Sequence, residues 1–170
     1  MRTNIPSFRL PATVLDEEVD RVIDFGVNVK FGHEVTSLKA VLDEDYDAVF
    51  VGTGAPRGKD LNIPGRQEAD ANIHIGIDWL TSVAFKHTES IGKRVVVIGG
   101  GDTAMDCVRT AVRQGAESVK CLYRRDRANM PGSQREVANA EEEGVEFVWL
   151  SAPKGFTGDT VDGVMVQQMR

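Results

Sequence analysis

The stretch Arg94-Val-Val-Val-Ile-Gly-Gly-Gly-Asp-Thr-Ala104 passes from β-branched residues to a glycine triplet and then to a helix-compatible segment. The apolar residues before the triplet are typical of a buried parallel strand. Gly99, Gly101 and Ala104 have the G-x-G-x-x-A spacing. In it the first glycine permits a tight turn, the second leaves the backbone open to a phosphate, and the small third residue lets the helix pack on its strand. A helix that begins here presents free N–H groups and a partial positive charge to that phosphate. The stretch therefore predicts a dinucleotide-binding turn made of Gly99, Gly100, Gly101, Asp102, Thr103 and Ala104.

The residues that follow the turn complete a βαβ unit. The segment 103–114 has apolar residues on one helical face, and Gly115 stands where a glycine would end that helix. Residues 119–123 then have the pattern of a second strand. A strand, a glycine turn, a helix and a strand within ~30 residues favour a nucleotide-binding unit. The alternative is a tight turn in an α/β domain that binds nothing.

The second strand ends in the basic cluster Tyr123-Arg-Arg-Asp-Arg127. An NAD site would carry an acidic residue at about this place, ~20 residues after the turn, to bind the ribose 2′-hydroxyl. Arg124 and Arg125 offer planar donor groups that suit a 2′-phosphate, so the cluster predicts NADP(H) rather than NAD(H). The alternative is a solvated loop in which the arginines pair with Asp126, an arrangement that contributes little stability.

The composition limits the other classes of function. Lys and Arg total 20 against 26 Asp and Glu, and the net charge of −6 argues against a general nucleic-acid or anionic-membrane binder. No apolar run is long enough to span a membrane, and no secretory signal is visible. Cys107 and Cys121 are expected to be core thiols, and two cysteines do not make a metal site by themselves. A cytoplasmic, reducing setting is expected.

Periodicity and breakers predict the remaining elements. Helices are expected over residues 13–25, 78–86 and 133–143, and a short helical or turn segment over 38–42. Strands are expected over residues 27–31, 47–51, 145–150 and 161–169. Proline and glycine gather at residues 56–65, which makes this segment the candidate crossing between two domains.

Four stretches together resemble the flavoproteins with two dinucleotide-binding domains, in the group that contains the glutamate synthase small (β) subunit. They are Ile5-Pro-Ser-Phe-Arg-Leu-Pro11, Tyr46-Asp-Ala-Val-Phe-Val-Gly-Thr-Gly-Ala55, Val97-Ile-Gly-Gly-Gly-Asp-Thr-Ala-Met-Asp106, and Tyr123-Arg-Arg-Asp-Arg127 with Met130-Pro131 and Glu141-Glu-Glu-Gly144. They span nearly the whole chain in the family's order. The resemblance implies a Rossmann-type α/β domain for NADPH with a mainly parallel sheet, preceded by a partial FAD-domain segment. The expected division is 1–58 for the FAD segment and crossover, and 59–170 for a C-terminally truncated NADP(H) domain.

The resemblance also implies roles for particular residues. Gly52, Thr53 and Gly54 match a flavin-side motif, the glycine turn matches the NADPH pyrophosphate site, and Arg124 and Arg125 match the 2′-phosphate binders. Asp102 matches an acidic or amide position beside the pyrophosphate. Because an acid would repel a phosphate, Asp102 is expected to bond backbone N–H groups or to cap the helix.

The implied activity is hydride transfer from NADPH to FAD, with electrons passed on to an acceptor subunit or an iron–sulfur protein. No catalytic side chains are predicted, because the cofactors carry the chemistry. The family's first FAD fingerprint does not precede residue 12, so the chain is expected to be a fragment that is inactive alone. Two other interpretations stay open: a non-enzymatic NADP-binding module, and a fragment whose cofactor site is not formed.

Overall fold

The computed structural model describes residues 1–55 and 57–170. Its contacts divide the chain into two compact units. Met1–Leu10 and Arg57–Arg170 form the first unit, and the second begins at Pro11 and ends before Arg57. Residues 1–10 thus pack with the C-terminal part of the chain, which no sequence pattern indicated. The assignment of an FAD segment and an NADP(H) domain to the two parts of the chain stays a prediction.

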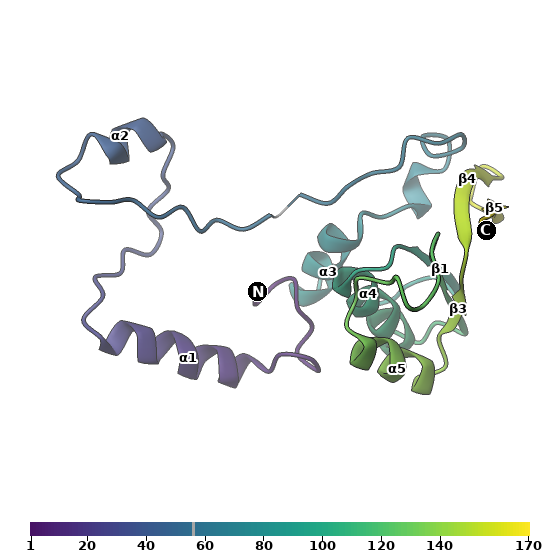
Figure 1. Cartoon of the computed structure of the whole chain (residues 1–170), viewed down its shortest axis with the longest axis horizontal. Helices are drawn as coiled ribbons and strands as arrows, with labels where there is room; N and C mark the ends of the chain where they lie inside the picture. The colour runs from purple at the N-terminus through teal and green to yellow at the C-terminus, as the bar shows by residue number, and fades with distance from the viewer. Residues whose placement is uncertain (56) are drawn as a thin grey trace. The chain divides into compact units, whose positions relative to one another are not determined.

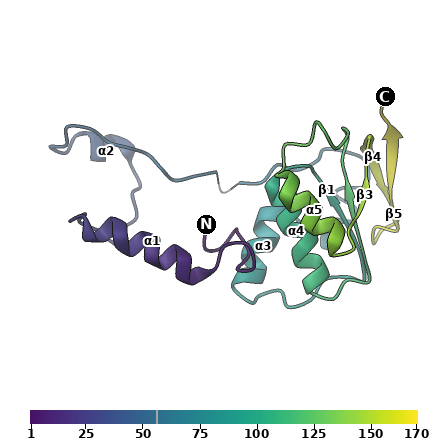
Figure 2. The same cartoon turned by 60° about the horizontal axis from the view of Figure 1, so that its bottom comes forward.

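A parallel three-stranded sheet organises the first unit. Its strands β1 (Arg94–Ile98), β2 (Ser118–Leu122) and β3 (Glu146–Val148) lie in the order β1-β2-β3. Helix α4 (Asp102–Arg113) connects β1 to β2, and α5 (Gln134–Glu142) connects β2 to β3. Figures 1 and 2 show α3, α4 and α5 gathered on one side of the strands. The predicted α/β class with a parallel sheet is confirmed.

The core of this unit lies between the helices and the sheet. Met105, Val108 and Ala111 on α4 are fully buried, because apolar residues recur along one helical face. They belong to one cluster with residues of the sheet, of α5 and of α3 (Gly76–Ala84), among them Val119, Cys121, Val137, Trp79 and Leu80. Gly115 ends α4 as expected, with φ of 87° and its N–H donated to Val112 O.

A hairpin follows the sheet and includes a strand that the sequence did not indicate. Strand β4 (Ser151–Thr157) pairs antiparallel with β5 (Gly163–Gln168), and only the second was expected. Pro153 and Gly155 interrupt the strand pattern in the sequence, because both residue types are uncommon inside strands. The pairing register of β4 and β5 shifts between Pro153 and Gly155. Proline and glycine are tolerated in a strand at such an irregularity. Figure 2 shows the hairpin on the side of the sheet away from α5.

The proline- and glycine-rich segment is partly fastened to this hairpin. Phe156 N–H donates to Pro64 O at 2.8 Å, and Gly65, with φ of +80°, lies against the Phe156 backbone. The short 3₁₀ helix η1 (Asp70–Asn72) follows. Residues 63–65 are therefore part of the first unit. Pro56, also in the expected crossing, lies outside the described residues.

The second unit contains helices α1 (Ala12–Asp24) and α2 (Leu38–Leu42), as expected, but no strand among residues 11–55. The predictions of strands at 27–31 and 47–51 are wrong. A strand requires a neighbour for its backbone N–H and C=O groups, and these segments pair with no other strand of the described chain. No residue of 11–55 is buried, and Phe25, Phe31 and Phe50 are each more than 80% exposed.

Both cysteines are buried thiols of the first unit, as predicted. Burial raises the pKa of each of Cys107 and Cys121 to about 12. Each thiol lies near a backbone carbonyl, Gly76 O for Cys107 and Gly99 O for Cys121. Of the helices in the described ranges, none is long and apolar enough to cross a membrane.

Candidate dinucleotide-binding site

The parallel pairing of β1 and β2 brings the glycine turn and the arginine cluster to the same edge of the sheet. Ile98, the last residue of β1, is paired with Leu122, the last residue of β2. Gly99 N–H donates to Leu122 O at 3.1 Å, so the two strands end at one level. In parallel α/β sheets, ligands bind at this carboxyl edge.

The three glycines of the turn have different surroundings. Gly99 has φ of +154°, and a Cβ there would be 3.3 Å from Ala104 Cβ, so the helix packs closely on the turn. A Cβ at Gly100 would be 2.3 Å from the Tyr123 ring. A Cβ at Gly101 would meet no protein atom within 4 Å. Gly99 and Gly100 therefore serve packing, and Gly101 alone leaves a space that a ligand can enter.

The N-terminus of α4 is open beside Gly101. Gly101 is the N-cap residue in an extended conformation, and no side chain caps the helix. The first N–H groups of the helix, at Asp102 and Thr103, have no partner within it. They and the helix dipole favour an anion, and the missing Cβ lets that anion approach. These residues fit the pyrophosphate of a dinucleotide.

Arg124 and Arg125 follow Tyr123, the first residue after β2, and both arginines are exposed. Across residues 1–55 and 57–170, no ion pair joins either guanidinium to a carboxylate. Asp126 instead accepts from Asn129, at 2.8 Å from both the backbone N–H and the side-chain amide, and these bonds lower the pKa of its carboxyl. Arg127 pairs with Glu141 at 2.5 Å. The arrangement in which Asp126 pairs with Arg124 and Arg125 is not present in the structure.

The side chain of Asp102 accepts a backbone N–H, as expected, but from a residue that no sequence pattern identified. Its Oδ1 accepts from Ser133 N–H at 3.0 Å. Its Oδ2 lies 3.6 Å from Arg9 Nη2. The end of the loop before α5, at Ser133, therefore contacts Asp102, the residue that follows the glycine triplet.

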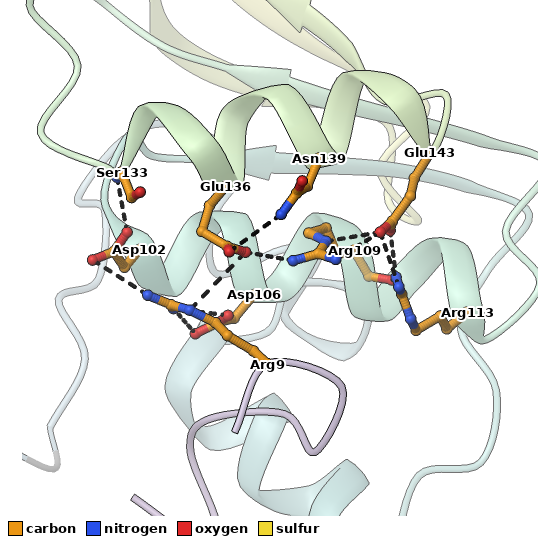
Figure 3. A network of polar contacts seen from close by, with 9 residues as sticks. All are labelled: Arg9, Asp102, Asp106, Arg109, Arg113, Ser133, Glu136, Asn139 and Glu143. Atoms are coloured by element: carbon orange, nitrogen blue, oxygen red, sulfur yellow. Dashed lines mark hydrogen bonds and ion pairs between the residues drawn. The ribbon is translucent and has the colours of Figure 1, made fainter. Parts of the chain in front are cut away.

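A charged network that the sequence did not predict joins residues 1–10 to α4 and α5 (Figure 3). Arg9 Nη1 donates to both carboxylate oxygens of Asp106, at 3.0 and 2.8 Å. Burial raises the pKa of the Asp106 carboxyl, and the Arg9 guanidinium offsets part of that effect. The Phe8 ring lies beneath two guanidinium groups, 4.8 Å from that of Arg109 and 3.9 Å from that of Arg113. Residues 8 and 9 thus anchor the N-terminal segment next to the glycine turn.

Glu143 at the end of α5 completes the network and gives the fold a pH dependence. It accepts from Arg113 Nη2 and from Arg109 Nε, both at 2.9 Å. These contacts, the Arg113 hydrogen bond first, lower the pKa of the Glu143 carboxyl from 4.5 to about 2. The pKa of Glu143 is lower in the folded chain than in the unfolded chain. The ionised carboxylate therefore stabilises the fold above about pH 4.5, and this contribution is lost as the pH falls toward 2.

We therefore expect the free energy of unfolding to fall between pH 5 and pH 2 by on the order of 1 kcal/mol more in the wild-type chain than in Glu143→Gln. Urea unfolding of both proteins across this range is the measurement. The comparison between the two proteins isolates Glu143. Asp106, whose pKa is raised, makes the free energy of unfolding change with pH in the opposite direction, but it does so equally in both proteins. Parallel pH profiles for the two proteins would contradict the assignment.

The predicted flavin-side residues Gly52, Thr53 and Gly54 lie in the second unit, where all three are exposed. Gly54 has φ of +75°, a conformation that glycine adopts without strain. In the described part of the chain, no three His, Cys, Asp or Glu side chains are grouped to hold a metal ion.

Comparison with known proteins identifies the family. The model of the pyridine nucleotide-disulphide oxidoreductase family matches residues 8–169. The chain belongs to this family. Among solved structures, a variant of FprA from Mycobacterium tuberculosis shares the fold, with a TM-score of 0.66 and 15% identity over 98% of this chain and 56% of that one. Thioredoxin reductase from T. acidophilum matches 66% of this chain and 35% of its own, with a TM-score of 0.52 and 16% identity.

Curated proteins with higher sequence identity to this chain are glutamate synthase small chains. The putative glutamate synthase [NADPH] small chain of Cereibacter sphaeroides is 53% identical over 180 residues, which cover 98% of this chain and 43% of the relative. The glutamate synthase [NADPH] small chain of Azospirillum brasilense is 50% identical over 92% of this chain and 35% of its own length. The chain thus spans less than half the length of these relatives.

Proposed function

We propose that the first unit binds NADP(H), with the pyrophosphate at the N-terminus of α4 and the 2′-phosphate at Arg124 and Arg125. The observation that carries the proposal is the position of these two arginines, exposed and without a carboxylate partner among the described residues, at the end of the strand next to the glycine turn. A guanidinium that is not engaged by an acid is free to form paired hydrogen bonds with phosphate oxygens.

We further propose that the complete protein is a flavin-dependent oxidoreductase similar to the glutamate synthase small subunit. Bound NADPH would supply a hydride to FAD, and the electrons would pass to an acceptor subunit or an iron–sulfur protein. The names of the relatives support NADPH as the reductant. Within this chain the residues bind and orient: Gly101 admits the pyrophosphate, the α4 terminus stabilises its charge, and Gly52, Thr53 and Gly54 are assigned to the flavin side.

Calorimetric titration of the chain with NADP⁺ and, separately, NAD⁺ tests the proposal. We expect NADP⁺ to bind at least about tenfold more tightly, because only NADP⁺ gains charged hydrogen bonds from the arginines. Equal affinities would contradict the 2′-phosphate site. Binding of neither nucleotide would contradict the site as a whole.

Arg124→Ala should weaken NADP⁺ binding by about 1–3 kcal/mol, roughly fivefold to 150-fold, and NAD⁺ binding much less. The reason is the loss of a charge-assisted hydrogen bond to a group that NAD⁺ lacks. Arg127→Ala is the matched control, since Arg127 lies on the same loop but is engaged by Glu141. Equal losses for both nucleotides in Arg124→Ala would place the residue elsewhere than at the 2′-phosphate.

A further inference from the structure

The loop between β2 and α5 is fastened to the glycine turn where it begins. We call this loop, residues 123–133, the arginine arm, because it carries Arg124 and Arg125. The Tyr123 ring fills the space that a side chain at Gly100 would need. That ring is buried, and its hydroxyl donates to Asn129 O at 3.3 Å, so the arm folds back on its own first residue.

The arm returns to the same turn where it ends. Gly132 N–H donates to Gly100 O at 2.9 Å, and a Cβ at Gly132 would be only 3.1 Å from that oxygen. At the next residue, Ser133 N–H donates to Asp102 Oδ1 (Figure 3). The Asp102 carboxylate thus lies at the start of α5, where the helix dipole favours a negative charge.

We propose that Asp102 is a positioning residue for nucleotide selectivity: it holds the end of the arginine arm on the glycine turn and so keeps Arg124 and Arg125 beside the phosphate-binding end of α4. This inference rests on the proposed NADP(H) site. The inference also explains why an acidic residue can stand next to a proposed phosphate site. The Asp102 carboxylate accepts from the Ser133 N–H and lies near Arg9. The Asp102 carboxylate acts on the nucleotide through the arm and does not contact it, whereas the backbone N–H of the same residue belongs to the proposed pyrophosphate site.

Two variants separate the acceptor oxygen of Asp102 from its charge. Asp102→Asn keeps an oxygen that can accept from Ser133 N–H, whereas Asp102→Ala removes it. Both lose the negative charge that faces Arg9, so the difference between them reports the hydrogen bond alone. Asp78→Ala is the matched control, since Asp78 is likewise an acid in the first turn of a helix, α3, outside the arm.

The measurements are calorimetric affinities for NADP⁺ and NAD⁺, and amide hydrogen exchange at Ser133 without nucleotide. We expect Asp102→Ala to bind NADP⁺ about tenfold more weakly than Asp102→Asn, with NAD⁺ changed less than about twofold. The Ser133 amide should exchange faster in Asp102→Ala than in Asp102→Asn or the wild type. Asp78→Ala should match the wild type in all three measurements.

Equal NADP⁺ affinities for the two Asp102 variants would overturn the proposal, as would equal losses for NADP⁺ and NAD⁺. Tighter NADP⁺ binding by both variants than by the wild type would show that the acid acts by repulsion, which also overturns it. If the wild-type chain binds neither nucleotide, the proposed function fails. The exchange comparison then decides separately whether Asp102 holds the arm, and equal exchange in both variants would show that it does not.

Discussion

Gly101→Val is expected to weaken NADP⁺ binding by at least about a hundredfold while the fold is retained. The backbone at Gly101, with φ of −95° and ψ of 176°, is accessible to any residue, and no protein atom would be near its Cβ. The valine side chain would therefore cost the fold little beyond a poorer N-cap. It would occupy the space through which a phosphate reaches the α4 terminus.

Calorimetry with NADP⁺ and thermal unfolding together test this expectation. Gly92→Val is the control, because a Cβ at Gly92 also meets no protein atom within 4 Å but lies outside the turn. Wild-type affinity in Gly101→Val would show that the turn is not the phosphate site. Loss of the folded structure would show that the space at Gly101 is needed by the protein itself.

Arg109→Ala should lower the free energy of unfolding by roughly 3–5 kcal/mol, because it leaves a buried carboxylate without its main partner. Arg109 and Glu136 are each only 8% exposed, and the guanidinium donates to Glu136 and to Glu143. Urea unfolding monitored by circular dichroism is the measurement. The loss combines a poorly compensated Glu136 charge with the missing contact to the Phe8 ring. Glu136 would keep the weaker contacts with Arg9 Nε at 4.0 Å and Asn139 Nδ2 at 3.4 Å.

Arg113→Ala provides the comparison for Arg109. Arg113 shares Glu143 and the Phe8 ring, but its side chain is 40% exposed, so its removal should cost less than about 1 kcal/mol. The double variant with Arg109→Met and Glu136→Leu should be more stable than Arg109→Ala, because it leaves no unpaired charge at the Glu136 position. Similar losses in Arg109→Ala and Arg113→Ala would contradict the burial argument.

The candidate site was predictable from the sequence where its residues act through local geometry. The strand, the glycine turn and the face of α4 follow from periodicity and from the positions of Gly99, Gly101 and Gly115 along one short segment. The position of Arg124 and Arg125 beside the glycine turn is predictable, because two parallel strands joined by a helix end at the same edge of their sheet. Each of these inferences needs only neighbours in the chain or one βαβ unit.

Residues that act across the chain were not predictable in this way. Pairing of Arg9 with Asp106 joins residues 97 positions apart, and no pattern in either segment identifies the partner. The strands expected at 27–31 and 47–51 fail for the same reason. Their β-branched composition supplies a propensity, but a strand forms only where another strand completes its hydrogen bonds.

The sequence by itself determined the α/β class, the helix that follows Gly101 and the two arginines that we propose as the phosphate-binding pair. The tertiary structure decided that Gly101 faces open space and that Asp126 bonds to Asn129 instead of pairing with Arg124 and Arg125. It also decided that Asp102 accepts from the Ser133 N–H. Propensity and periodicity are properties of a segment, whereas these contacts depend on distances between segments that only the packed chain establishes.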